Sequence, residues 1–129
     1  MVKLRTVNTA YKKEYKSMKL KVNDIHKFYG EKESRIEVLK GIDCEVSEGE
    51  ICVLLGPSGS GKATLLNIIG GLESADSGCI DIGTFCTDNM SEKDLSSYRR
   101  NNLGFVFQFY NLVQNLTVIE NVELAVQLC

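Results

Sequence analysis

The sequence predicts an α/β fold of about one domain, built around a glycine-rich loop that joins a strand to a helix. The chain has 129 residues, within the range of ~100–150 in which one hydrophobic core forms one domain. Five consecutive apolar residues, Ile51 to Leu55, are typical of a strand covered on both faces in the middle of a parallel sheet. The glycine-rich loop follows directly, and apolar residues at helical spacing come next. A phosphate-binding loop requires this order of strand, loop and helix.

The composition excludes several classes of protein. Hydrophobic residues make up 43% of the chain and charged residues 25%, as in ordinary soluble globular proteins and unlike disordered chains. The longest apolar run has five residues, far below the ~20 that cross a bilayer. The formal net charge of −2 argues against a general nucleic-acid-binding surface.

The N-terminal segment differs in charge from the rest of the chain. Residues 1–21 carry seven basic side chains and one acidic one, whereas residues 22–129 carry eight basic and sixteen acidic ones. Residues 1–17 show no sustained helical or strand period. We therefore expect 1–17 to be a disordered basic tail and the domain to occupy 18–129. The alternatives for the tail are a misplaced start before Met18 and a basic segment resting on an anionic membrane surface.

The cysteines predict a reduced compartment. Five cysteines occur, with no CxxC pair and no histidine at metal-ligand spacing. No apolar export segment follows the basic start. We expect free thiols that act as small apolar side chains in the cytosol. The five are Cys44, Cys52, Cys79, Cys86 and Cys129.

The segment before the loop predicts two extended stretches, and hence an antiparallel N-terminal β region. Leu20, Val22 and Ile25 lie among polar residues, and a second apolar stretch begins at Ile36 and continues to Val46. A polar turn separates the two stretches, and another polar turn precedes the apolar strand.

The segment after the loop predicts alternating helices and strands. A helix follows Lys62 and ends at two glycines, a strand lies near 79–82, and a helix runs from about Ser91 to Arg100. Ser91 and Asp94 have the spacing of a capping box. Two further elements complete the prediction, a short buried strand at 105–107 and an amphipathic helix from Val118, with Thr117 and Glu120 as its capping box.

The loop itself fits the pattern G-x-x-x-x-G-K from Gly56 to Lys62. Glycine lets the backbone approach phosphate closely, and successive N–H groups then form a cradle. The following helix adds unpaired N–H groups and the positive end of its dipole, and Lys62 can reach the β- and γ-phosphates. The alternative, a glycine turn that binds nothing, does not explain the flanking strand and helix. The predicted ligand-binding residues here are Gly56, Pro57, Ser58, Gly59, Ser60, Gly61, Lys62, Ala63 and Thr64.

Ala63 departs from the pattern, which places Ser or Thr after the lysine so that a hydroxyl coordinates Mg²⁺. A methyl group cannot coordinate a metal. Thr64 is a poor substitute, because one step along a helix rotates the side chain by about 100°. We expect nucleotide binding to persist and metal-assisted hydrolysis to be weakened.

Several motifs in order give the chain a family resemblance. The quoted segments are IEVLKGID, GPSGSGKATLLNIIGGL, YRRNNLGFVFQFYNL and LTVIENVEL. From Met18 to Cys129 the sequence resembles the first half of the nucleotide-binding domain of an ABC transporter, nearest to the lipoprotein-releasing and macrolide-export ATPases. This resemblance implies an incomplete ATP-binding domain over 18–129. Its implied fold is an α/β, P-loop NTPase-like partial domain, with an antiparallel N-terminal β region and a parallel-sheet core, truncated before the Walker B strand.

The resemblance implies roles for two residues outside the loop. Tyr29 lies where the family stacks an aromatic ring on adenine, and Gln108 matches the Q-loop glutamine that contacts Mg²⁺ and the attacking water. Without the resemblance, Tyr29 is an ordinary strand-end tyrosine and Gln108 a surface amide. Residues 109–116 then lie near the groove for the permease, although Phe109 and Tyr110 can instead belong to the core. His26 precedes the adenine tyrosine, so it is not the family's switch histidine.

The implied function is that of an ATP-binding subunit, with ATP and Mg²⁺ as cofactors, that powers transport through a membrane permease. Its implied partners are the permease and a second ATP-binding subunit, and its location is cytoplasmic, on the inner face of the cell membrane. The family's signature motif, Walker B carboxylates and switch histidine come after the region matched here, so we expect no catalytic residue in this chain.

Two alternatives remain open from the sequence. The first is a nucleotide-binding remnant or partial reading frame without ATPase activity. The second is another P-loop class such as a GTPase or small-molecule kinase, although the guanine-reading NKxD motif does not occur. We also expect the isolated chain to be poorly soluble or weakly folded, because the loop strand would lack its usual neighbours.

Overall fold

The computed structural model describes residues 3–7, 20–83, 85–87 and 90–127. Within these residues, no helix is long and apolar enough to cross a membrane. The strands are β1 (Lys3–Val7), β2 (Leu20–Tyr29), β3 (Ile36–Val46), β4 (Ile51–Leu55), β5 (Ser77–Ile82) and β6 (Phe85–Cys86). The helices are α1 (Lys62–Ile69), α2 (Glu92–Asn102) and α3 (Val118–Gln127), with a short 3-10 helix η1 (Lys32–Ser34).

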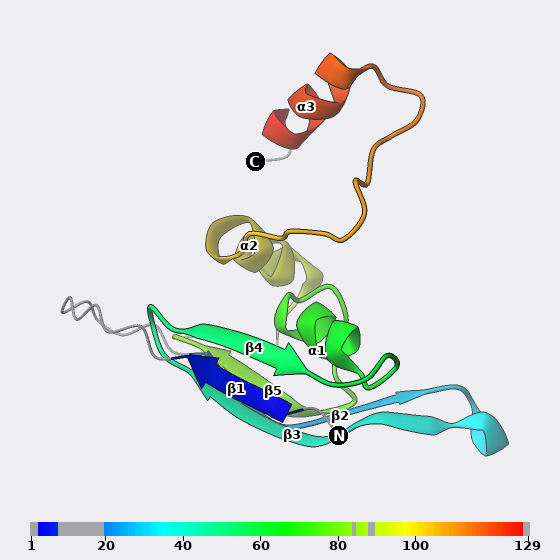
Figure 1. Cartoon of the computed structure of the whole chain (residues 1–129), viewed down its shortest axis with the longest axis vertical. Helices are drawn as coiled ribbons and strands as arrows, with labels where there is room; N and C mark the ends of the chain where they lie inside the picture. Colours follow the sequence, from blue (N-terminus) through cyan, green and yellow to red (C-terminus); the bar gives the residue numbers. More distant parts are fainter. Residues whose placement is uncertain (1–2, 8–19, 84, 88–89, 128–129) are drawn as a thin grey trace.

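The strands form two antiparallel sheets (Figure 1). The larger sheet has the order β3-β2-β5-β6, and its long β2–β3 hairpin confirms the expected antiparallel N-terminal β region. The smaller sheet pairs β1 with β4, the strand that leads into the glycine loop. The loop thus follows a strand of the smaller sheet, and its last glycine, Gly61, packs against β3 of the larger sheet.

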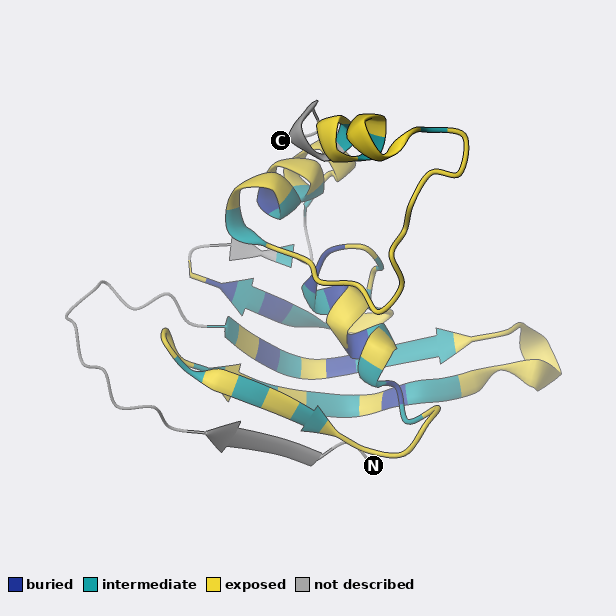
Figure 2. Ribbon diagram, turned by 45° about the horizontal axis from the view of Figure 1, so that its top comes forward, coloured by how far each residue is buried: buried dark blue, intermediate teal, exposed yellow. Residues whose placement is uncertain are grey.

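The core lies between the larger sheet and the helices α1 and α2. Figure 2 shows the buried positions gathered in β2, β5 and α1. Leu65 and Ile68 project from α1 and join apolar residues of the sheet, while Tyr98 adds a contact from α2. The residues of this core are Val22, Ile25, Leu39, Leu65, Ile68, Ile80, Ile82 and Tyr98.

α1 ends at the two glycines that the sequence predicts as its terminators, and α2 covers this end. Gly71 has a φ of 63°, a backbone conformation that favours glycine. Two α2 side chains donate to carbonyls at this end: Tyr98 Oη to O of Ile69, the last residue of α1, at 3.0 Å, and Arg99 Nη1 to O of Gly71, two residues further on, at 2.6 Å. These bonds satisfy carbonyls that have no partner inside a helix, and the arginine charge suits the negative end of the dipole.

Both predicted capping boxes are confirmed. At the start of α2, Asp94 N donates to Ser91 Oγ at 3.3 Å and Ser91 N donates to Asp94 Oδ2 at 3.1 Å. The hydrogen bonds from Ser91 lower the pKa of the Asp94 carboxyl. At the start of α3, Glu120 N donates to Thr117 Oγ1 at 3.3 Å and Thr117 N donates to Glu120 Oε2 at 2.7 Å.

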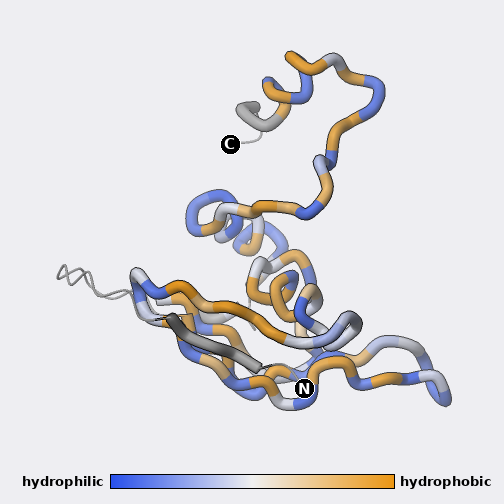
Figure 3. Tube along the Cα trace, viewed as in Figure 1, coloured by the Kyte–Doolittle hydropathy of each residue, from blue (hydrophilic) through white to orange (hydrophobic). Residues whose placement is uncertain are grey.

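β4 and the segment after α2 differ from expectation. Ile51 is 61% exposed and Val53 and Leu55 are also exposed, so β4 is not covered on both faces by the described residues. The predicted buried strand at 105–107 is wrong: Val106 is fully exposed and no strand forms there. No described strand pairs with 105–107, so its carbonyl and N–H groups gain no ladder. Figures 1 and 3 show a long irregular segment with repeated hydrophobic positions leading to α3, which stands apart from the sheets.

Two expectations about the N-terminus and the thiols also need correction. The disordered-tail prediction fails for Lys3–Val7, which form β1 because the free edge of β4 offers a ladder to an extended chain; residues 8–17 lie outside the described residues. Cys79 is disulfide-bonded, whereas Cys44 and Cys52 are free. The free-thiol prediction is therefore wrong for Cys79.

Candidate functional site

The glycine loop is an exposed turn between β4 and α1 whose shape depends on two glycines. Ser60 N donates to Pro57 O at 3.3 Å and closes the turn. Gly59 and Gly61 have φ values of 76° and 90°, in the left-handed region. A Cβ at Gly61 would lie 2.8 Å from Leu39 Cδ2 and 3.2 Å from Val38 O. Only glycine therefore lets the end of the loop pack against β3.

α1 begins at this loop with its N-terminal donors free of a side-chain cap. Gly61 is the N-cap residue and has no side chain to accept their hydrogen bonds, and the first turn holds no acidic residue. The helix ladder starts with Leu65 N donating to Gly61 O at 2.9 Å. The N–H groups of the first turn have no acceptor within the helix, and the positive dipole end is not neutralised there. This arrangement favours an anion at the loop.

Lys62 places its ammonium group against the loop. Its Nζ donates to Gly56 O at 2.8 Å and Pro57 O at 2.7 Å, and it lies 3.4 Å from Ser60 Oγ. The carbonyl oxygens orient the ammonium group but do not neutralise its charge. The structure therefore brings together a lysine cation and a helix N-terminus, the two positive features that the sequence predicts for phosphate binding.

Ala63 and Gln108 line one cavity of about 470 Å³, although 45 residues separate them in the sequence. The cavity lies between α1 and the segment after α2, and Leu66, Gly70 and Phe105 also line it. The ring of Phe105 packs against Gly70 so closely that a Cβ at Gly70 would lie only 2.5 Å from Phe105 Cζ. The structure thus places Gln108, the predicted Q-loop residue, at a cavity that α1 also lines.

The donor set for a metal ion is poor. In the described part of the chain, no group of three or more His, Cys, Asp or Glu residues has the geometry to hold one. Ala63 supplies no oxygen, and the side-chain oxygens on the cavity wall come from the amides of Asn67 and Gln108. Mg²⁺ prefers carboxylate, hydroxyl and water oxygens in octahedral geometry. Gln108 as a metal contact remains a prediction.

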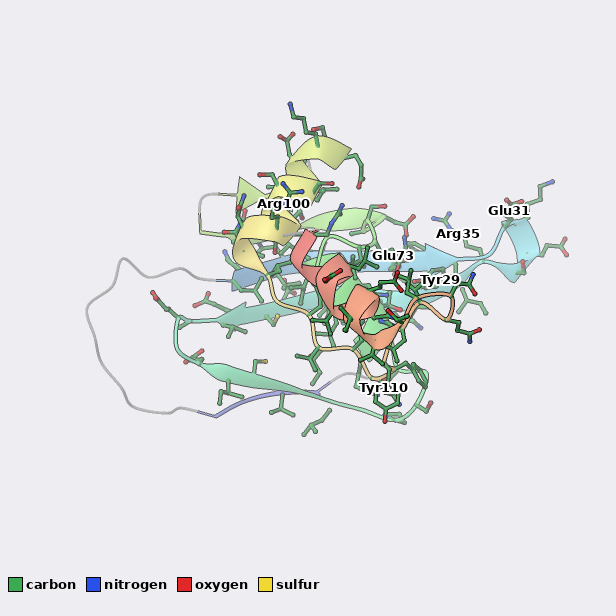
Figure 4. All side chains as sticks on the ribbon, turned by 90° about the horizontal axis from the view of Figure 1, so that it is seen from above. Tyr29, Glu31, Arg35, Glu73, Arg100 and Tyr110 are labelled. Carbon is green, nitrogen blue, oxygen red and sulfur yellow. The ribbon has the colours of Figure 1, made fainter. Side chains whose placement is uncertain are left out.

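Tyr29 ends β2 beside the β3 segment that supports the loop. Tyr29 pairs with Ile36 of β3. Val38 lies two residues, or about 7 Å, further along β3, and it packs against Gly61 at the end of the loop. The Tyr29 ring is 42% exposed. Its hydroxyl donates to Glu73 Oε1 at 2.5 Å, and Figure 4 labels both side chains. Sequence reasoning missed Glu73, because nothing in the local pattern points to a contact across 44 residues.

His26 forms a polar contact on the same hairpin. Its Nδ1 lies 2.6 Å from Glu37 Oε1 and its Nε2 lies 3.2 Å from Asp24 Oδ1. The hydrogen bond with Glu37, with a smaller contribution from Asp24, raises the pKa of the imidazole above its ordinary value. His26 therefore joins two carboxylates within the hairpin.

The comparison with known families identifies the family to which this chain belongs. A sequence model of the ABC transporter family matches residues 39–128, which include the glycine loop, α1 and the Gln108 segment. The chain belongs to the ABC transporter family. The resemblance predicted from the motifs is therefore confirmed.

Curated relatives share a large part of the sequence. The bacitracin export ATP-binding protein BceA of Halalkalibacterium halodurans is 46% identical over 105 residues, covering 81% of this chain and 42% of BceA. The lipoprotein-releasing system ATP-binding protein LolD of Bacteroides thetaiotaomicron is 46% identical over 103 residues, covering 80% of this chain and 45% of LolD. The chain therefore spans less than half the length of these relatives.

Solved ABC cassettes share the fold. A dimeric post-hydrolysis structure of the ATP-binding cassette MJ0796 with ADP and phosphate superposes with a TM-score of 0.71 at 40% identity. The superposition covers 81% of this chain and 45% of MJ0796. The predicted fold class, an α/β P-loop partial domain of the ABC type, is confirmed. The expected parallel-sheet core does not appear among the described strands, because all of their pairings are antiparallel.

Proposed function

We propose that this chain supplies the Walker A half of an ATP site in an ABC transporter's ATP-binding subunit, and that the subunit powers transport through a membrane permease. The observation that carries the proposal is the loop at 56–62. It combines two left-handed glycines, an uncapped helix N-terminus and the Lys62 ammonium in one exposed turn. Those are the groups that hold the phosphates of a nucleotide.

The nucleotide fits the site better than its metal does. Backbone donors and Lys62 recognise phosphate without Mg²⁺, whereas Ala63 offers no ligand. Magnesium, when bound, neutralises charge that develops on the transferred phosphoryl group. We propose that the chain binds ATP with weakened dependence on Mg²⁺, and that Tyr29 and Gln108 contact the adenine and the γ-phosphate side of the site.

ATP hydrolysis is proposed as the activity of the whole protein. MJ0796 was captured after hydrolysis, with ADP and phosphate, which supports this activity for an assembled cassette. We assign no catalytic residue to this chain, and we expect the 129 residues alone not to turn over ATP.

The proposed partners are a permease and a second ATP-binding subunit. BceA and LolD are named as ATP-binding proteins of an export system and a releasing system, and MJ0796 forms a dimer. Phe109 and Tyr110 are exposed and do not belong to the core, which supports 109–116 as the permease-facing segment. We propose a peripheral position on the cytoplasmic face of the cell membrane for the assembled subunit.

Equilibrium dialysis of the full 129-residue chain against labelled ATP tests the binding proposal. Lys62→Ala removes the loop cation, while Lys40→Ala removes an exposed cation from β3 as a matched control. We expect ATP binding by the wild type and Lys40→Ala, and a loss of at least about tenfold, or ~1.4 kcal/mol, in Lys62→Ala. Equal binding by all three proteins would show that the loop is not the site. Phosphate release by the 129-residue chain would contradict the expectation that this chain alone does not turn over ATP.

A further inference from the structure

We propose that Glu73 positions the Tyr29 ring and thereby sets the affinity of the site for the adenine base. This inference rests on the proposed function, in which Tyr29 stacks on adenine. Glu73 lies just after α1, whereas Tyr29 ends β2. The contact should affect binding of the adenine base, whereas binding of the phosphates at the loop should not depend on it.

The contact between the two residues is short and charge-assisted. Tyr29 Oη donates to Glu73 Oε1 at 2.5 Å, within the range of strong O–H···O⁻ bonds. The same oxygen lies 3.3 Å from Lys27 Nζ, whose ammonium also donates to Ser74 O at 2.7 Å. Glu73 therefore receives a hydroxyl and faces an ammonium group at once.

The Lys27 side chain completes the support of the ring. Its Nζ lies 5.5 Å from the centroid of the Tyr29 ring, a cation–π distance. The side chains of Lys27 and Glu73 are only 13% and 24% exposed, so water competes weakly for their contact. The ring is thus fixed at its hydroxyl by Glu73 and approached by a cation from its own strand.

Hydrogen bonds that do not involve the Glu73 side chain hold the loop after α1 to β2 and to α1. Phe28 N donates to Asp76 Oδ2 at 2.8 Å, and Asp76 N donates to His26 O at 2.9 Å. Glu73 N donates to Asn67 O at 3.3 Å. A substitution of the Glu73 side chain should therefore remove the support of the ring while the loop stays attached to the strand.

The consequence is a preorganised stacking surface. A half-exposed tyrosine at a strand end samples several rotamers, and each rotamer that cannot stack lowers the apparent affinity for the base. A hydrogen bond at the far end of the ring selects one orientation before the nucleotide arrives. The effect applies to ligands that carry adenine and not to inorganic tripolyphosphate, which occupies only the phosphate loop.

The test compares ATP and tripolyphosphate binding by the full chain in three variants. Tyr29→Phe removes the hydroxyl but keeps the ring, Glu73→Ala removes the acceptor, and Glu73→Gln keeps an amide oxygen that still accepts from Tyr29. We expect Tyr29→Phe and Glu73→Ala each to weaken ATP binding about 3- to 10-fold, the range of one hydrogen bond. Glu73→Gln should recover most of this loss. Tripolyphosphate affinity should stay within about twofold throughout, which also reports that the loop is folded.

A double variant and a matched control sharpen the result. The Tyr29→Phe/Glu73→Ala protein should bind ATP no more weakly than the weaker single variant, because both changes break one contact. Glu33→Gln, an exposed change in η1, should leave both ligands unaffected. Unchanged ATP affinity in Tyr29→Phe and Glu73→Ala, or an equal loss for both ligands, would overturn the positioning role. Failure of the wild type to bind either ligand would instead overturn the proposed function.

Discussion

At the scale of single residues, Ala63 is the position at which the loop departs from the phosphate-loop pattern. It is the second residue of α1, directly after Lys62, and it lines the same cavity as Gln108. The loop has the left-handed glycines, the uncapped helix start and the lysine of the pattern, and we propose that its missing hydroxyl weakens metal binding more than phosphate binding. The two properties can therefore be measured apart.

Restoring the hydroxyl should restore the metal dependence. With Ala63→Ser, we expect Mg²⁺ to raise ATP affinity by about tenfold, or ~1.4 kcal/mol, because the serine supplies an oxygen ligand. In the wild type, Mg²⁺ should change affinity by no more than about twofold. Dialysis with Mg²⁺ or with EDTA measures both, and Ala63→Val is the control for side-chain size. A wild-type affinity that already rises tenfold with Mg²⁺ would contradict this role of Ala63.

His26 predicts a specific pH dependence. Because its contacts with Glu37 and Asp24 raise the pKa of the folded imidazole above the unfolded value of 6.5, protonated His26 stabilises the fold below that value. This contribution is lost as the pH rises through the raised pKa. The chain has one histidine, so an NMR titration follows it without ambiguity. Glu37→Gln should bring the pKa down, and an ordinary or lowered pKa in the wild type would exclude this account.

At the scale of elements, the sequence predicts the features that depend on neighbouring residues and misses several contacts between distant segments. The strand, loop and helix at 51–69 and both capping boxes depend on neighbours within a few residues, and the sequence predicts them. Strand β1 forms because it pairs with the edge of β4, and 105–107 form no strand because no described strand pairs with them. The local sequence pattern of neither segment reveals whether such a partner strand exists. The Tyr29–Glu73 contact spans 44 residues for the same reason.

The capping box of α2 gives a prediction at this scale. Ser91→Ala should lower the free energy of unfolding by about 1 kcal/mol, because the N-cap acceptor is lost. The pKa of Asp94 is lowered in the folded state, so its contribution is present above the ordinary value and disappears as the pH falls through the folded pKa. Urea denaturation of Ser91→Ala and of the control Ser97→Ala measures the difference. Equal stability of the two variants would argue against the capping role.

At the scale of the whole molecule, the described residues expose apolar side chains in several elements. The exposed apolar residues of the described chain include Ile51, Val53 and Leu55 of β4, Phe105, Val106 and Phe107 after α2, and Val118, Ile119 and Val122 of α3. The chain covers 42% of BceA and 45% of LolD. Contiguous exposed apolar patches and free strand edges promote association. We therefore expect these exposed apolar residues to cause the poor solubility predicted for the isolated chain.

Strand β1 should limit this association by covering one edge of β4. A chain that begins at Met18 lacks β1 and should form more oligomer or aggregate at equal concentration. Sedimentation velocity measures the distribution, and Lys12→Ala/Lys13→Ala controls for the loss of basic charge outside β1. A truncated chain that sediments like the full one would show that β1 does not protect β4.

The central claim is that the loop at 56–64 and Tyr29 form one nucleotide site in this chain. A titration of the ¹⁵N-labelled 129-residue protein with ATP, followed by amide chemical shifts, tests it most directly. The account predicts saturable shifts concentrated at the amides of Gly56, of Ser58–Thr64 and of Tyr29. Tripolyphosphate should reproduce the shifts of the loop amides but not the shift of Tyr29. Saturating ATP that leaves those amides unmoved, or shifts only residues elsewhere, would contradict the account.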